Sequence, residues 1–228
     1  MAIVHETFNT TANTIATTSH TVTKPTGTVA GDVLVAAIAF NGTPGTITPP
    51  TGWVSIATAL GQANPKAYGW YLVAGGSEPA SYTWTTTGSI TSGCGISRYS
   101  GVDTTTPIDV TGVGTDGVAA TSASLTGVTT ATNNAMVIAA MGVNSSTTVI
   151  TEVSAVVVER WEVGGKESEH DSDIFATAGA TGTIDYTFAA SRAWAGWVAA
   201  LRPVAAAAAD RILPAMVIAP SLPMMAEV

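Results

Sequence analysis

Three nearly uninterrupted apolar runs constrain the fold of this chain more than any other feature of its sequence. Val33–Phe40 holds eight apolar residues between turn residues, and Ala135–Val143 and Ala195–Leu201 have the same character. An apolar run of this length with turn residues at its ends is typical of a strand buried on both faces. It is far shorter than the roughly 20 residues that a membrane helix requires. The runs therefore predict three central strands of a β core and give no indication of a membrane partner.

Other segments alternate in polarity and predict half-exposed strands. Aromatic residues stand at alternate positions in Tyr68–Val73, Ser81–Thr85 and Ile184–Phe188. A period of two places successive side chains on opposite faces of a strand. Frequent turns between short strands are typical of a sandwich or barrel, and residues 1–203 contain no capped helical period. The predicted fold class is all-β, with a single antiparallel β-sandwich over residues 1–203.

The apolar runs Val33–Phe40 and Met136–Val143 are alike in composition. Two core strands of one sandwich would show the same likeness, so the similarity does not by itself indicate a duplication. We therefore interpret the sequence as one domain without an internal repeat.

The composition excludes several classes of protein. The chain has 8 Lys and Arg against 16 Asp and Glu, a net charge of −8, and its 37 Thr and 23 Gly fit β structure. So few cations cannot form a surface that follows a phosphate backbone, so no nucleic-acid partner is expected. Cys94 is the only cysteine, which excludes an intramolecular disulfide and a cysteine-based zinc site. The first residues carry neither a basic region nor an apolar core, so we expect synthesis in a cytoplasm without a signal peptide.

The composition changes at Pro203, and residues 204–228 are here called the C-terminal arm. The arm begins with Val204 and five alanines at 205–209, and it contains three further prolines, which prevent a long helix. We expect an extended, apolar assembly arm that becomes ordered only against a well-fitting partner surface. Its large apolar side chains are the predicted interface: Ile212, Leu213, Met216, Val217, Ile218, Leu222, Met224 and Met225.

Two further motifs have both a functional and a structural interpretation. Residues 112–117 match G-x-G-x-x-G, but no strand-to-helix context for dinucleotide binding surrounds them, so we interpret them as a glycine-rich loop. The acidic segment Glu167–Asp173 would place its carboxylates about 6–7 Å apart along one strand face, too widely spaced for a single ion. A solvated strand face or hairpin is the favoured interpretation, and bound calcium is the alternative.

The sequence predicts no catalytic residues, no metal site and no cofactor. It contains no Gly-x-Ser-x-Gly elbow and no His-Glu-x-x-His motif, and its three histidines have no triad or metal-ligand spacing. Trp53, Trp70 and Trp84 could form a platform for stacking sugars. Aromatic residues in β-sandwiches fill the core more often, so core packing is the favoured interpretation for each.

A series of short phrases along residues 4–203 resembles a known family. The series comprises Ala30–Ala36, Pro49–Trp53, Tyr71–Ala74, Ser77–Trp84, Tyr99–Asp103, Pro107–Asp109 and Trp194–Pro203. It resembles a jelly-roll-like β-sandwich module of tailed-bacteriophage virion proteins and some large bacterial surface proteins. The phrases are strand starts, turns and strand ends, and the family implies no shared active site.

The resemblance implies an external virion component, and three function classes follow. The first is a non-enzymatic capsid decoration protein on the head surface, with the major capsid protein and copies of itself as partners. The second is a tail-tip or fibre module that binds host glycans through Trp53, Trp70 or Trp84. The third is an enzyme, which the missing nucleophile and acid-pair motifs disfavour.

Overall fold

The computed structural model describes residues 2–60, 64–145, 147–164 and 168–205. Within these ranges the chain is all-β, as the sequence predicts, and none of it forms a helix that could cross a membrane. The first half of the chain contributes β1 (Val4–Thr23), β2 (Val33–Phe40), β3 (Ile47–Thr48), β4 (Val54–Leu60), β5 (Lys66–Val73) and β6 (Ser81–Ser100). The second half contributes β7 (Ile108–Leu125), β8 (Ala135–Val143), β9 (Ile150–Glu152), β10 (Val158–Val163), β11 (Ser168–Phe175) and β12 (Ile184–Leu201).

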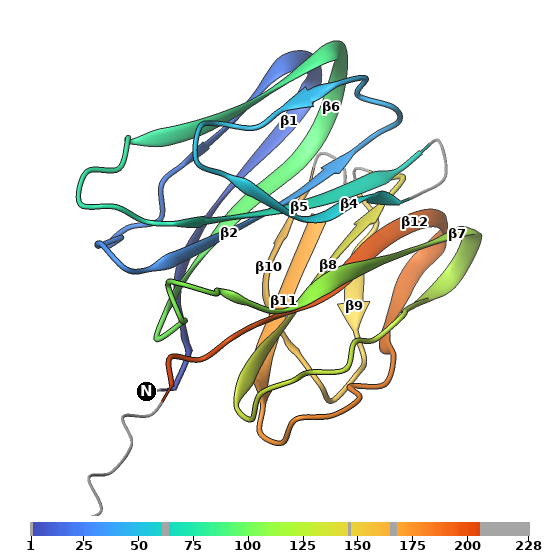
Figure 1. Cartoon of the computed structure of the whole chain (residues 1–228). Helices are drawn as coiled ribbons and strands as arrows, with labels where there is room; N and C mark the ends of the chain where they lie inside the picture. The colour runs from blue at the N-terminus through green and yellow to red at the C-terminus, as the bar shows by residue number, and fades with distance from the viewer. Residues whose placement is uncertain (1, 61–63, 146, 165–167, 206–228) are drawn as a thin grey trace, which may run out of the picture.

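The strands form two antiparallel sheets that pack face to face, which confirms the predicted β-sandwich (Figure 1). One sheet has the order β1-β6-β2-β5-β4, with β3 paired to β6. The other has the order β10-β11-β8-β12-β7, with β9 paired to β12. Adding six to each strand number of the first sheet gives the strand order of the second sheet, read from its opposite edge. Each sheet therefore comes from one half of the chain, and both sheets have the same topology.

Local details support this equivalence of the two halves. Gly31 and Asn134 precede β2 and β8, and both have positive φ, at 89° and 59°. Gly31 donates its backbone N–H to the carbonyl of Ala74, just after β5, at 2.9 Å. Asn134 donates its backbone N–H to the carbonyl of Ala176, just after β11, at 3.2 Å. The likeness of the first two apolar runs thus reflects equivalent strands in a duplicated architecture. Our interpretation of a chain without an internal repeat was therefore wrong.

Three apolar clusters hold the structure together. The central cluster lies between the two sheets, and each half adds an outer cluster of its own. In the first half, the β1–β6 register shifts between Asn13 and Ser19, and the chain beyond the shift covers the outer face of the sheet with Val22, Tyr82 and Trp84. Because a second layer covers this face, β5 is packed on both faces, and the predicted half exposure of Tyr68–Val73 was wrong.

Residues 112–117 lie inside β7 and do not form a loop, which corrects our interpretation of that motif. Gly114 pairs with Trp197 and Gly117 pairs with Trp194 across the β7–β12 ladder. A Cβ built on Gly117 would collide with the indole ring of Trp194. The strand therefore has glycine here because a tryptophan ring lies against its backbone.

Tryptophan and glycine also interlock the two sheets. A Cβ on Gly69 of β5 would lie 2.6 Å from Cζ2 of Trp197, and a Cβ on Gly95 of β6 would collide with the ring of Trp161. Trp161 also donates its Nε1–H to Ser97 Oγ at 2.9 Å across the interface. Gly95 and Trp197 occupy equivalent positions of the repeat. Gly95 of β6 pairs with Ala37 of β2, and Trp197 of β12 pairs with Ala140 of β8. Tryptophan rings of the second half thus fill the flat spaces beside the glycines of the first half.

Candidate functional site

The eight apolar arm residues predicted as an interface lie outside the described residues, which end at Ala205. The structure does describe the point at which the arm leaves the sandwich. Pro203 forms a bridge with Val102, and Val204 donates its N–H to the carbonyl of Gly101 at 3.0 Å. The start of the arm is therefore held by backbone bonds to the linker between the two halves.

The exit of the arm lies next to the N-terminal end of the described chain (Figure 1). Gly101 has a φ of 75°, and a Cβ at this position would collide with the carbonyl oxygen of Ala2. This close approach requires glycine and brings the two ends of the sandwich together. The N-terminal end of the described chain and the exit of the arm therefore lie on the same surface of the sandwich.

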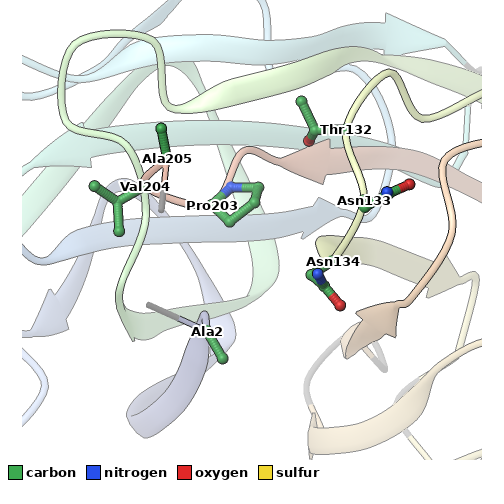
Figure 2. Close-up of a pocket in the computed structure, with 7 residues that line it drawn as sticks. All are labelled: Ala2, Thr132, Asn133, Asn134, Pro203, Val204 and Ala205. Atoms are coloured by element: carbon green, nitrogen blue, oxygen red, sulfur yellow. The ribbon is translucent and has the colours of Figure 1, made fainter. Parts of the chain in front are cut away.

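A pocket of about 520 Å³, here called the terminal pocket, opens at this surface (Figure 2). Three segments far apart in sequence surround it: the N-terminus, the loop before β8 and the start of the arm. Its lining is uncharged and comprises Ala2, Thr132, Asn133, Asn134, Pro203, Val204 and Ala205. An apolar lining with a few amide and hydroxyl groups suits an uncharged ligand such as an apolar peptide segment.

Asp109 fixes the loop that forms one wall of the terminal pocket. Its fully buried carboxylate accepts hydrogen bonds from the N–H of Ala131 at 2.6 Å and from the Oγ1 of Thr132 at 2.8 Å. The same carboxylate lies 3.4 Å from the Nε of Arg202, which directly precedes the exit. One buried anion thus joins the loop wall to the exit of the arm.

Trp53, Trp70 and Trp84 come together in the outer cluster of the first half. Their exposed fractions are 6%, 6% and 0%, and the Trp53 and Trp84 rings contact each other edge to face at 4.9 Å. A sugar platform needs exposed ring faces, so this placement corresponds to the core-packing interpretation.

The acidic segment enters the second sheet as β11, between β10 and β8. Glu167 lies outside the described residues, and the structure describes only the backbone of 168–171. Asp173 is half-buried, and its Oδ1 accepts the N–H of Ile174 at 2.7 Å. Among the side chains that the structure describes, no group of three His, Cys, Asp or Glu residues is placed to hold a metal ion.

A buried polar network in the first half brings together residues that sequence reasoning did not connect. His20 Nδ1 lies 2.7 Å from Ser92 Oγ, and His20 Nε2 lies 3.2 Å from Thr86 Oγ1. Thr86 donates its hydroxyl to the carbonyl of Gly88, so its oxygen accepts from His20 Nε2, and Ser92 then donates to Nδ1. The thiol of Cys94 lies 3.2 Å from Ser92 Oγ.

This network is enclosed, which separates it from the dyads of nucleophilic enzymes. His20, Ser92 and Cys94 are each 0% exposed, so no substrate can reach the serine oxygen in this structure. Burial raises the pKa of the Cys94 thiol to about 12 and lowers the pKa of His20 below its ordinary value. The network therefore satisfies polar groups inside an apolar cluster and fixes the β1–β6 pairing.

We expect acid to destabilise the protein through His20. Its pKa is lower in the folded state than in the unfolded chain, so the unfolded chain binds the proton first as pH falls. Stability is therefore fully present above the unfolded pKa of about 6.5 and decreases below it, by up to about 1.4 kcal/mol per pH unit for one proton. Urea denaturation at pH 7 and pH 5 measures this loss.

The matched variant for this test is His20→Asn, which keeps a polar side chain but does not titrate. We expect it to be less stable at pH 7 and to lose less stability between pH 7 and pH 5. His5, whose pKa burial lowers to about 4, remains in both proteins and cancels in the comparison. An equal loss in both proteins would show that His20 is not the titrating group.

Comparison of the chain with protein-family models, with curated proteins and with solved structures gives no match. Sequence reasoning missed the terminal pocket, because Asn133 and Asn134 read as turn residues and nothing local connects them to residues 2 and 203.

Proposed function

We propose that the chain is a non-enzymatic structural virion protein of a tailed bacteriophage, most specifically a capsid decoration protein on the head surface. Its proposed partners are the major capsid protein and copies of itself. The observation that supports this most is the exit of the arm: a sandwich with complete apolar clusters holds the start of an apolar, proline-rich segment at one fixed point.

The energetics of the arm favour a role in assembly. Burial of its eight large apolar side chains would contribute about 1.5–3 kcal/mol each. Ordering the seventeen residues from 212 to 228 would cost about 1–2 kcal/mol each in backbone entropy. Because these totals are of similar size, the arm gains from order only where a partner surface fits it well.

The described part of the sandwich favours a structural role over a catalytic one. In the part of the chain that the structure describes, a serine and a histidine lie within hydrogen-bonding distance in the enclosed network around Ser92, and the terminal pocket has no titratable side chain in its lining. The burial of Trp53, Trp70 and Trp84 gives the glycan-binding alternative no support. We therefore favour capsid decoration over glycan binding.

Binding to phage heads tests the proposal. Two arm variants are compared with the full chain: one that ends at Ala205, and a full-length one with Met216→Asp, Val217→Asp and Ile218→Asp. Ending at Ala205 retains the bonds of Pro203 and Val204 that close the sandwich. Heads that lack the protein are mixed with each variant and sedimented, and bound protein is quantified.

We expect both arm variants to lose at least tenfold in bound protein while their melting temperatures stay near that of the full chain. The control is Val118→Asp on β7, a residue that is 72% exposed and distant in sequence from the arm, and it should bind normally. Retention of full binding by both arm variants would overturn the proposal.

A further inference from the structure

We infer that the terminal pocket receives the apolar C-terminal arm of a second copy of this chain, so that two copies exchange arms. The inference deepens the proposed function, on which it rests, by naming the first surface that the arm contacts. The occupant is the uncharged segment 212–218, Ile-Leu-Pro-Ala-Met-Val-Ile.

The position of the pocket supports an exchange between copies. Pro203, Val204 and Ala205 form one wall, and in Figure 2 the chain runs from Pro203 to Ala205 away from Asn133 and Asn134. The first large apolar side chain, Ile212, follows Ala205 by seven residues, a span of up to about 23 Å when extended. The arm of the same chain would have to reverse its direction to enter, whereas a copy facing this surface can insert its arm directly.

Symmetry makes the exchange self-consistent. In a two-fold arrangement the same surface of both copies forms the interface, so each copy gives one arm and receives one. The arm and the pocket lie together at the chain exit. One two-fold axis near this surface would therefore bring the arm of each copy within reach of the pocket of the other copy. A contact of this kind is closed and does not lead to filaments.

The chemistry of the lining fits the proposed segment. The wall residues Ala2, Pro203 and Val204 offer apolar contact, and neither the lining nor segment 212–218 carries a charge. Asn133 already accepts the N–H of Ala178 with its Oδ1 at 2.8 Å, so its amide nitrogen is the group that it can offer to a ligand. A peptide carbonyl is the acceptor that such a donor requires.

The pocket volume is of the right order as well. About 520 Å³ lies within the range of roughly 300–1,000 Å³ that is usual for protein ligand sites. This space accommodates a few side chains and not the whole arm. The remaining apolar side chains of the arm are then free to contact the head surface.

Cross-linking of the full-length protein tests the inference. One variant carries Ala2→Cys at the pocket, and three others carry a single arm cysteine: Leu213→Cys, Val217→Cys or Leu222→Cys. Cys94 does not interfere, because it is buried and its thiol pKa is raised to about 12. The pocket variant, enlarged by a tag, is mixed with each arm variant, oxidised mildly and analysed on a non-reducing gel.

We expect a disulfide-linked mixed dimer for at least one arm position, at a yield at least fivefold above that of a matched control. The control replaces Ala2→Cys by Val118→Cys, which is exposed on β7. A chain that carries both Ala2→Cys and Val217→Cys should form linked dimers. If that chain instead closes a disulfide within one monomer, the arm occupies its own pocket and the inference fails.

Absence of any disulfide between pocket and arm would also overturn the inference. This outcome differs from a failure of the proposed function, which would appear as normal head binding by the chain that ends at Ala205. An arm that is needed on heads but never links to Ala2→Cys would leave decoration standing and remove arm exchange alone.

Discussion

Replacement of Trp161 by alanine should lower the free energy of unfolding by about 3–5 kcal/mol, the usual cost of truncating a large buried aromatic side chain. The ring is 3% exposed, lies against the Gly95 backbone and donates a hydrogen bond to Ser97. Its loss leaves a cavity between the two sheets. Urea denaturation with an unchanged m-value would measure the effect directly.

The complementary change, Gly95→Ala, should cost about 1–3 kcal/mol because the added methyl group displaces the ring of Trp161. The two changes should be non-additive, since the methyl group fits the space that Trp161→Ala opens. The control is Gly76→Ala, where an added Cβ meets no atom within 4 Å, and it should change stability by less than about 0.5 kcal/mol. Additive effects of Trp161→Ala and Gly95→Ala would contradict the interlocking of the halves.

Replacement of Asp109 by alanine should destabilise the protein by about 2–3 kcal/mol. It removes the acceptor for the backbone N–H of Ala131 and for Thr132, and it leaves Arg202 without its carboxylate partner. Arg202 is partly exposed, so the ion pair accounts for the smaller part of this loss. The unfolding free energy at pH 7 measures the total.

The matched variant Asp109→Asn retains a side-chain oxygen of the same reach and should recover more than half of the stability. In both variants we also expect faster amide exchange at Ala131 and Thr132, because their common acceptor is lost or weakened. Unchanged exchange at these two amides in Asp109→Ala would show that the carboxylate does not hold the pocket wall.

The central strands were predictable from sequence because a strand buried on both faces appears as a continuous run of apolar residues. Val33–Phe40 and Ala135–Val143 coincide with β2 and β8, and the alternating Ile184–Phe188 lies in β12 as predicted. In contrast, β1 gave no clear signal. Its Thr-rich stretch is largely half-buried or exposed, and its strand character depends on pairing with β6 about 60–100 residues away.

The repeated topology could not be predicted because residues at equivalent positions of the two halves differ strongly where the sheets meet. Where one half has Gly95, the other has Trp197, and the two residues have nothing in common locally. The likeness of β2 and β8 had a simpler explanation in shared burial. The common pairing order, together with the matching positive φ angles and backbone hydrogen bonds of Gly31 and Asn134, reveals the repeat.

The terminal pocket likewise depends on tertiary structure. Residue 2, the loop at 132–134 and the start of the arm meet because β1 begins, and β12 ends, at the same side of the sandwich (Figure 1). Composition places the beginning of the arm after Pro203, two residues beyond the end of β12. Arg202, the first residue beyond β12, already forms backbone hydrogen bonds with Asp103 and Pro107 of the linker, and Pro203 then forms a bridge with Val102.

The molar mass of the purified protein in solution tests most directly the central claim that the arm, and not the sandwich, joins copies. Light scattering compares the full-length chain of 22.9 kDa with a chain that ends at Ala205. We predict a mass near twice the monomer for the full chain and a monomer for the shortened one. Equal masses for the two chains would contradict the claim.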